Sequence, residues 1–286
     1  MATQTIDAGT PYTQNEGRID EDAVFAYALA TNDSNDAYLR GGAVPPVFTV
    51  SLIRSAFAEA STRGTKPGMI RGARVGVHAQ HDVHLINPVR PGMAVQWRGH
   101  THCARQTPAG SLVTQRIEVS DTDGTPLVEH YWSTLHVGGH LDADVGPDLP
   151  DHTFPQEARE RLLGTRVVDV TRDQGFRYAG ASGDRNAHCV DDEAARREGF
   201  PSKILQGLCT FALCSGVVLN VGANGAPERL RRIAGRFSSP VFPGQSLTVE
   251  VFDAGHTPDG AAVLAFEATS NGVTVLKHGR AELHPD

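Results

Sequence analysis

The sequence predicts an α+β protein made of two similar units, each with one long helix followed by a meander of antiparallel strands. Two pairs of similar segments within the sequence support this prediction. Residues 27–35 (Tyr-Ala-Leu-Ala-Thr-Asn-Asp-Ser-Asn) resemble residues 178–186 (Tyr-Ala-Gly-Ala-Ser-Gly-Asp-Arg-Asn), 151 positions later. Residues 89–95 resemble residues 241–247 at nearly the same offset. Self-similarity at a fixed spacing over half of a chain indicates a duplicated structural unit.

The elements follow the same order in each half. In the first half, an apolar segment with helical spacing at 47–60 follows Pro45-Pro46, which favours a helix start. Alternating residues between Pro-, Gly- and Asp-rich turns then predict strands at 75–86, 93–103, 111–120 and 126–137. The second half predicts a helix at 205–221 and strands at 230–237, 247–253, 263–270 and 273–283. This second helix is apolar all round, which is typical of a helix wrapped by a sheet. We therefore expect a double hot-dog, with two helix-wrapped antiparallel sheets in one chain.

A linker is expected between the halves. Residues 138–155 carry Gly, Pro and Asp with little periodicity. We therefore place an N-terminal unit at residues 1–145 and a C-terminal unit at residues 155–286, and we expect the two sheets to pair side by side.

Composition bounds the function. The chain has 286 residues, of which 40% are hydrophobic and 21% charged, as in folded globular proteins. Its net charge of -7 and pI near 6.0 disfavour a nucleic-acid partner, which needs a basic face. The sequence shows no signal peptide and no apolar stretch of the ~20 residues that a membrane span needs. We expect a soluble, cytoplasmic protein with no nucleic-acid or membrane partner.

The cysteines and histidines do not predict a metal site. No cysteine pair has metal-binding spacing, and without export signals the thiols are expected to be reduced. His78, His81 and His84 recur every third residue, but in a predicted strand residues three apart point to opposite faces. The four cysteines are Cys103, Cys189, Cys209 and Cys214.

Several stretches of the second half resemble one family. Residues 182–186 (Ser-Gly-Asp-Arg-Asn), 199–201 (Gly-Phe-Pro) and 204–211 (Ile-Leu-Gln-Gly-Leu-Cys-Thr-Phe) look like the signature of the MaoC-like, or type 2 (R)-specific, enoyl-CoA hydratases. Residues 236–244 resemble that family's late strand and turn, and the first half resembles the degenerate N-terminal unit of its two-unit members. The resemblance implies hydration of a trans-2-enoyl thioester, or the reverse dehydration, without a metal or redox cofactor.

The resemblance also implies an active site. Family members use an Asp and a His five residues apart to activate one water, because syn addition needs a base and an acid on one face of the substrate. A backbone N–H at the start of the buried helix stabilises the thioester enolate, since a helix N-terminus offers unpaired donors and positive potential. The Asp falls on Asp184, its accompanying Asn on Asn186 and the N–H donor on Gly207. Ser182 and Tyr178 of the same motif are expected to contact the substrate.

The sequence departs from the family pattern at two positions. The expected His falls on Cys189, and the neighbouring His188 is displaced by one residue, which turns a side chain by about 100° in a helix or to the opposite face in a strand. Gln206 stands where the family usually has His, and we expect it to position substrate rather than exchange protons. The first half has Asp33 and Asn35 but lacks the helix-start Gly motif, so it is expected to shape the acyl tunnel.

Alternatives remain open at these residues. Asp184 is either a proton-transferring group or a capping carboxylate. Cys189 is a catalytic thiolate, a small buried residue or a relic, and a thiol with a pKa near ~8.5 needs a cationic neighbour to ionise at neutral pH. His188 either reaches the site through a local bend or lies at the surface. Cys209 and Cys214 are expected to be core residues.

Three function classes follow from these alternatives. The first, which we favour, is a hydratase or dehydratase of an enoyl or 3-hydroxyacyl thioester. The second is a different lyase or isomerase of a related acyl substrate, and the third is a non-catalytic subunit that binds an acyl thioester. The partner is an acyl thioester of coenzyme A or of a carrier protein. The acidic chain leans towards coenzyme A, unless the basic run 229–232 forms an entrance, and a homodimer stays open.

Overall fold

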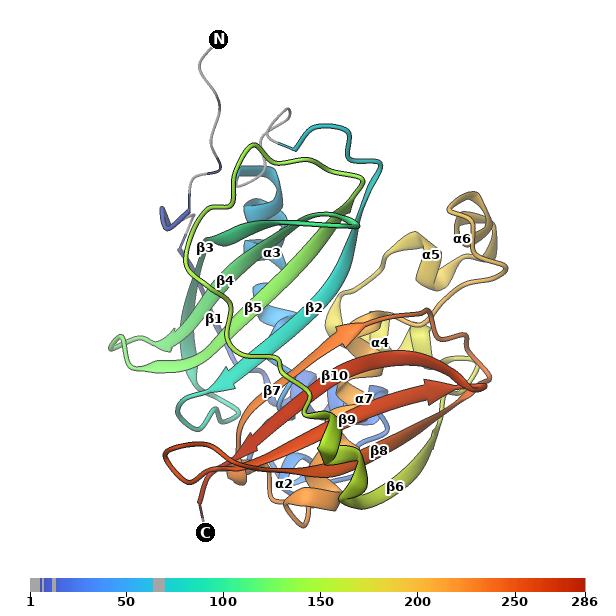
Figure 1. Ribbon diagram of the computed structural model, residues 1–286. Helices are drawn as coiled ribbons and strands as arrows, with labels where there is room; N and C mark the ends of the chain where they lie inside the picture. The colour runs from blue at the N-terminus through green and yellow to red at the C-terminus, as the bar shows by residue number, and fades with distance from the viewer. Residues whose placement is uncertain (1–5, 7, 12–13, 64–69, 286) are drawn as a thin grey trace. The chain divides into compact units, whose positions relative to one another are not determined.

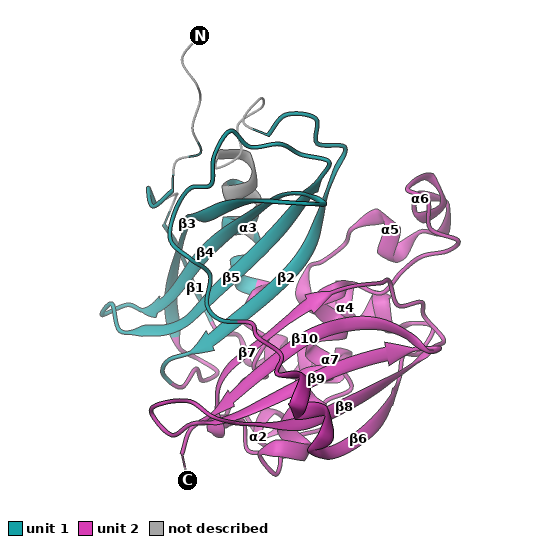
Figure 2. Cartoon of the chain, in the orientation of Figure 1, with its two compact units in different colours: residues 1–18, 52–87, 94–151 teal, residues 19–51, 88–93, 152–286 magenta. Residues whose placement is uncertain are grey.

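The computed structural model describes residues 6, 8–11, 14–63 and 70–285. It divides the chain into two compact units (Figure 2). Unit 1 comprises residues 1–18, 52–87 and 94–151, and unit 2 comprises residues 19–51, 88–93 and 152–286. These units do not coincide with the two stretches of sequence on either side of the linker, because residues 19–51 pack with the second half. The division at 145 and 155 stays a prediction about the duplication.

Unit 1 is built on a five-stranded antiparallel sheet. Its strands lie in the order β1-β3-β4-β5-β2. Helix α3 (Val50–Arg63) lies behind this sheet (Figure 1), and the Phe57 ring stacks on Trp132 with 3.9 Å between ring centroids. The strands are β1 (Asn15–Arg18), β2 (Val75–Leu85), β3 (Ala94–Thr107), β4 (Gly110–Asp121) and β5 (Pro126–Val137).

Unit 2 repeats this topology. Its strands lie in the order β6-β8-β9-β10-β7, which is the order of unit 1 with each strand replaced by its counterpart. The identical order confirms that each half of the chain carries one helix-wrapped sheet. The strands are β6 (Leu162–Asp169), β7 (Leu230–Phe237), β8 (Ser246–His256), β9 (Ala262–Ser270) and β10 (Val273–Leu283).

The core of unit 2 forms around helix α7 (Gly207–Gly222). Phe211 and Val218 of this helix are fully buried, as are Leu247, Val249 and Val251, which alternate along β8 towards it. Burying each such side chain contributes roughly 1.5–3 kcal/mol. The sheet of unit 2 therefore packs on the apolar side chains of α7. This packing fixes the position of the helix, and with it the loops at its ends.

The remaining helices of unit 2 come from both halves of the sequence. Helix α1 (Glu21–Ala30) begins at the N-cap Asp20, whose carboxylate accepts the Ala23 N–H at 2.8 Å. It packs against α4 (Gln174–Ser182), with the rings of Tyr27 and Tyr178 5.6 Å apart. The short elements are α2 (Asp36–Leu39), α5 (Ala187–Val190), α6 (Asp192–Arg197), η1 (Gln156–Glu160) and η2 (Pro227–Arg229).

The histidines at every third position give one correction. Residues 75–85 form a strand as predicted, but the register of β2 against β5 shifts between His78 and Gln80. Because of this bulge, His78 and His81 both contact the Trp132 ring, with centroids 4.2 and 5.3 Å away. The expectation that the two side chains lie on opposite faces is therefore wrong.

The described residues lack two features that would bear on function. No helix in the described part of the chain is long and apolar enough to cross a membrane. Within the same residues, no group of three or more His, Cys, Asp or Glu side chains is arranged to hold a metal ion.

Candidate active site

The site begins where helix α4 ends. Gly183 adopts a left-handed conformation (φ 74°) that stops the helix and turns the chain. Asp184 follows at once, with only 6% of its surface exposed. The Asn186 side-chain N–H donates to Asp184 Oδ1 at 2.8 Å, and the Asp184 backbone N–H donates to Ser182 Oγ at 3.2 Å. The motif therefore holds a buried carboxylate in one orientation.

Gln206 joins this segment to the start of α7. Its side-chain Nε2 donates to the carbonyl oxygens of Gly175 and Asp184 at 3.0 and 3.1 Å. These two acceptors fix the orientation of the amide, and its Oε1 atom has no hydrogen-bond partner among the described residues. With 2% of its surface exposed, Gln206 braces the Asp184 turn from inside.

Gly207 opens helix α7 and is exposed between buried neighbours. The Gln206 carbonyl accepts the N–H groups of Cys209 and Thr210, at 3.0 and 3.1 Å. The N–H groups of Gly207 and Leu208 come before the first N–H group that bonds within the helix, so they have no acceptor inside it, as at any helix N-terminus. A donor and the positive end of the helix dipole therefore lie one residue from the side chain that binds the Asp184 carbonyl.

Cys189 and His188 face different surroundings. Both lie on α5, where Cys189 is 2% exposed and turned inward. His188 turns outward, and its Nδ1 lies 2.8 Å from Glu198 Oε2. Its ring also approaches Phe200, with centroids 6.1 Å apart. Of the two open positions for His188, the structure shows the one away from Asp184.

Buried phenols and thiols surround the carboxylate. Burial raises the pKa of Tyr178 well above its usual value, and the charges of Tyr27, Cys209 and Asp184 raise it further. Burial likewise raises the pKa of the Cys209 thiol, with smaller contributions from Cys189 and Asp184. Both groups are protonated near pH 7, so neither of them adds a negative charge beside the Asp184 carboxylate. Burial also raises the pKa of Cys214 to about 12, in keeping with its expected role in the core.

The basic run at 229–232 is not an open cationic patch. Arg231 donates to both Asp259 and Glu282. Arg232 is 7% exposed and donates to Glu282 at 3.0 Å. Two of these arginines are thus neutralised within the sheet, and this run gives no support to an entrance for an acidic ligand.

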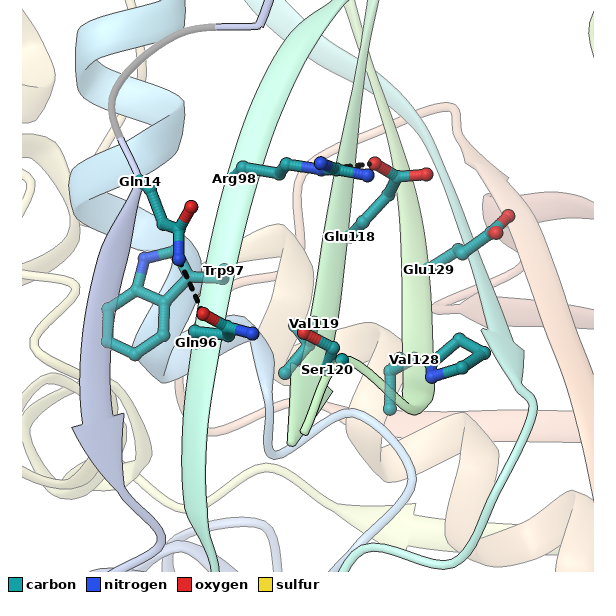
Figure 3. Close-up of a pocket in the computed structure, with 11 residues that line it drawn as sticks. Gln14, Gln96, Trp97, Arg98, Glu118, Val119, Ser120, Val128 and Glu129 are labelled. Carbon is teal, nitrogen blue, oxygen red and sulfur yellow. Dashed lines mark hydrogen bonds and ion pairs between the residues drawn. The ribbon is translucent and has the colours of Figure 1, made fainter. Parts of the chain in front are cut away.

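Unit 1 has a hollow of its own, of about 190 Å³. It lies over β3, β4 and β5, with the Arg98–Glu118 ion pair at its upper side (Figure 3). The Gln14 side chain closes one side by a hydrogen bond to Gln96. None of the site residues predicted from the sequence lines this hollow.

Comparison with known proteins defines the class of fold first. A crystal structure of a MaoC-like dehydratase from Phytophthora capsici superposes with a TM-score of 0.82, at 20% identity over 96% of both chains. A Mycobacterium tuberculosis protein described as having a double hot-dog fold superposes with a TM-score of 0.61, at 13% identity over 97% of this chain and 96% of that one. The chain is therefore a double hot-dog protein, as the sequence predicts.

The family follows from the sequence of the second half. Residues 154–272 match the MaoC-like domain, so this part of the chain is a MaoC-like domain. The chain is 26% identical over 213 residues to a probable enoyl-CoA hydratase 2 of Dictyostelium discoideum, covering 73% of this chain and 70% of that protein. It is 32% identical over 178 residues to 3-hydroxyacyl-thioester dehydratase Y of Mycobacterium tuberculosis, covering 60% and 59% of the two chains. It spans only 35% of a Drosophila melanogaster peroxisomal multifunctional enzyme type 2, to which it is 25% identical.

Proposed function

We propose that this protein is a hydro-lyase that adds water to an enoyl thioester or removes it from a 3-hydroxyacyl thioester. The observation that carries the proposal is the brace formed by Gln206, which holds the buried Asp184 turn against the N-terminus of α7. A proton-transferring group and an oxyanion donor are thereby held together. The names of the hydratase and dehydratase relatives support the same reaction class.

The Asp184 carboxylate alone can carry the proton from the water to the α-carbon. In hydration, it takes a proton from water as the water oxygen bonds to the β-carbon, and the double-bond electrons shift to the thioester to give an enolate. The enolate oxygen accepts the Gly207 N–H, where the helix dipole favours negative charge. The protonated Asp184 then returns its proton to the α-carbon. Because one group serves both steps, both additions take place on one face of the substrate and no imidazole is needed.

The neighbours of Asp184 act on its position. Asn186 donates to Oδ1 and orients the carboxylate, and Gln206 fixes the backbone of the same residue. Tyr178 and Ser182 are the residues that we propose border the substrate. Cys189 is 2% exposed and turned inward, and we propose that it is a packing residue.

The outward orientation of His188 supports one competing function. With His188 paired to Glu198, Asp184 could instead take a γ-proton from a 2-enoyl thioester to give a dienolate and return that proton to the α-carbon, which moves the double bond to the β,γ position without water. The thioester carrier, coenzyme A or a carrier protein, is the same in both proposals.

The test is an assay of the purified full chain with a panel of enoyl and 3-hydroxyacyl thioesters. We expect the absorbance of the conjugated enoyl thioester to fall while the product mass rises by one water. A change in absorbance at constant mass would indicate the isomerase. Binding of the thioester without any conversion would contradict both and indicate a non-catalytic binding protein.

A further inference from the structure

Two buried histidines form a hydrogen-bonded pair inside unit 1. His81 Nε2 of β2 lies 3.0 Å from His130 Nδ1 of β5, and both residues are 0% exposed. His81 is paired with Trp132 across the two strands, and His130 lies two residues before Trp132, so the three side chains share one face of the sheet. The Phe57 ring of α3 stacks on Trp132, so this is the face that the helix covers. The pair is therefore enclosed between the sheet and α3.

The geometry of the pair limits how many protons it can hold. One ring nitrogen must donate a hydrogen and the other must accept it, so the accepting ring is neutral as long as the bond exists. Protonation of both rings would place positive charges on two nitrogens 3.0 Å apart and away from water, where burying a charge is costly. The two histidines therefore bind fewer protons in the folded protein than in an unfolded chain.

The charged groups near the pair do not reverse this preference. Burial is the largest cause that lowers the pKa of both rings, while the charge of His78 lowers the pKa of His81 further and that of His84 lowers the pKa of His130. Asp82 raises both pKa values, but by less than burial lowers them. Its carboxylate also lies 3.3 Å from His84 Nε2.

The elements packed against the pair contribute few titratable side chains. Gln115 and Ile117 of β4 are paired with the β5 residues of this face, and neither titrates. On α3, Arg54 and Glu59 are the charged residues whose side chains the structure describes, and neither is among the groups that shift the pKa of either histidine. Burial therefore dominates the titration of the pair.

The interiors of the two units differ in this respect. In unit 1, a third imidazole, His78, stacks on Trp132 with ring centroids 4.2 Å apart, and burial lowers its pKa to about 3. In unit 2, Val249, Ala268 and Leu276 lie side by side on β8, β9 and β10 and are all 0% exposed. A fall in pH therefore acts on the interior of unit 1 and not on this apolar row of unit 2.

We propose that the pair of His81 and His130 makes unit 1 a pH-sensitive switch: acid charges the pair, breaks its hydrogen bond and releases α3 from the sheet, while unit 2 stays folded. An unfolded histidine has a pKa near ~6.5, and burial holds the pKa of both folded histidines below it. The stabilisation is therefore fully present above about pH 6.5 and is lost as the pH falls below it. Each proton that only the unfolded chain binds lowers the folding equilibrium constant about tenfold per pH unit. The switch does not depend on the reaction proposed above.

Tryptophan fluorescence reports on unit 1 alone, because both tryptophans of the chain, Trp97 and Trp132, belong to it. A titration of the full chain from about pH 8 to about pH 4 should shift the emission to longer wavelength as Trp132, which is 5% exposed, becomes accessible. Hydrogen exchange measured by mass spectrometry, corrected for the intrinsic effect of pH, should show that α3 and β5 lose protection while α7 keeps it. Unchanged emission over this range, or loss of protection in α7 together with unit 1, would overturn the proposal.

The variants His81→Gln and His130→Gln separate the pair from acid effects elsewhere. An amide can still hydrogen-bond to the remaining imidazole but takes up no proton. Urea unfolding followed by fluorescence should therefore show roughly tenfold less change in the folding equilibrium constant between about pH 6 and pH 5 than in the wild type. Each variant is compared with itself at two pH values, so a variant that is less stable at every pH still gives the answer.

The matched control is His256→Gln, which removes an exposed histidine from β8 and should keep the pH dependence of the wild type. Equal pH dependence in the wild type and in both variants of the pair would contradict the proposal. If neither variant folds, the fluorescence and exchange titration of the wild type decides alone.

Discussion

The Asp-x-Asn motif occurs twice in unit 2, and the two copies share their local structure. Asn32 and Gly183 both adopt positive φ, 54° and 74°, and each directly precedes the Asp. In each copy the backbone N–H of the Asn donates to the Asp Oδ1, at 3.1 Å in the first and 3.4 Å in the second. Each Asn then begins a four-residue helix, α2 or α5. The duplication therefore preserved a turn as well as a sequence.

The copies differ in where they meet helix α7. Asp184 is tied through Gln206 to the N-terminus of that helix. Asn35 donates to the carbonyl of Gly225 at 2.6 Å, just beyond the C-terminus, and the Asp33 carboxylate lies 3.3 Å from a Cβ placed on Gly216. Burial raises the pKa of Asp33 above its usual value. One copy thus lies at the end of α7 that has N–H donors, whereas the other contacts the middle of the helix through Asp33 and the region just beyond its C-terminus through Asn35.

The difference shows that the motif alone does not define a site. A helix N-terminus carries about half a positive charge and its C-terminus about half a negative one. Negative charge that develops on a thioester oxygen is stabilised at the first end and opposed at the second. The geometry around Asp33 keeps the turn but places its carboxylate beside Gly216 in the middle of α7, away from the N-terminal donors.

The largest expected effect separates the two carboxylates. Asp184→Asn should lower kcat by a factor of roughly 10²–10⁴ with folding nearly intact, because the amide keeps the shape but cannot carry the proton. Asp33→Asn, the same change in the other copy, should leave kcat within a factor of about two. Turnover assays of both variants, with circular dichroism as a check of folding, decide this. Equal losses in the two would end the distinction between the copies.

The second prediction tests whether the Gly207 N–H at the N-terminus of α7 contributes to catalysis. Gly207→Pro removes the N–H donor and should cost ~3 kcal/mol of transition-state stabilisation, or a factor of about 10² in kcat. Pro is tolerated at the first helical position, and Gln206 already has the extended backbone (φ -56°, ψ 133°) that a following Pro requires. Gly207→Ala places the same Cβ against Phe237 but keeps the donor, so it is the matched control. A Pro variant as active as the Ala variant would remove Gly207 from the mechanism.

The smallest effects concern Cys189 of α5, which occupies the position equivalent to Tyr38 of α2; both residues are 2% exposed. Cys189→Ser should change kcat by less than about tenfold if the thiol only packs. Cys189→His should increase water addition if the pocket holds substrate in hydratase geometry. Intact-protein mass spectrometry of the wild type with substrate should show no acyl adduct on Cys189, and an adduct would identify a nucleophile. His188→Ala, which removes the outward imidazole, is the control and should be neutral.

Elements with a clear period could be predicted from the sequence, and those defined by distant contacts could not. The strands at 230–237 and 273–283 have the predicted ends, because alternation and flanking turns define them locally. Strand β6 was missed since it lies at the sheet edge and leaves Leu162, Leu163 and Val167 exposed, which gives no alternation. The sequence shows α1 and α4 only as two similar segments and not as helices, because each packs against the other across about 150 residues of chain.

The site shows the same division. The turn around Asp184 and the start of α7 at Gly207 follow from Gly and Asn positions that can be read directly. The brace by Gln206 could not be predicted, because its acceptors at Gly175 and Asp184 are far from it in sequence. The direction of His188 depends equally on Glu198, ten residues further along the chain.

The interleaving of the two compact units along the sequence has a consequence for where the chain can be divided. A fragment encoding only residues 155–286 would lack α1, whose Tyr27 covers Tyr178 and whose Ala30 carbonyl accepts the Gln174 side chain at 2.6 Å. In such a fragment the Tyr178 ring would lose its Tyr27 contact and the Gln174 side chain would lose its hydrogen-bond acceptor. Cutting the chain at the linker would therefore remove part of the core of unit 2, because residues 19–51 pack with the second half.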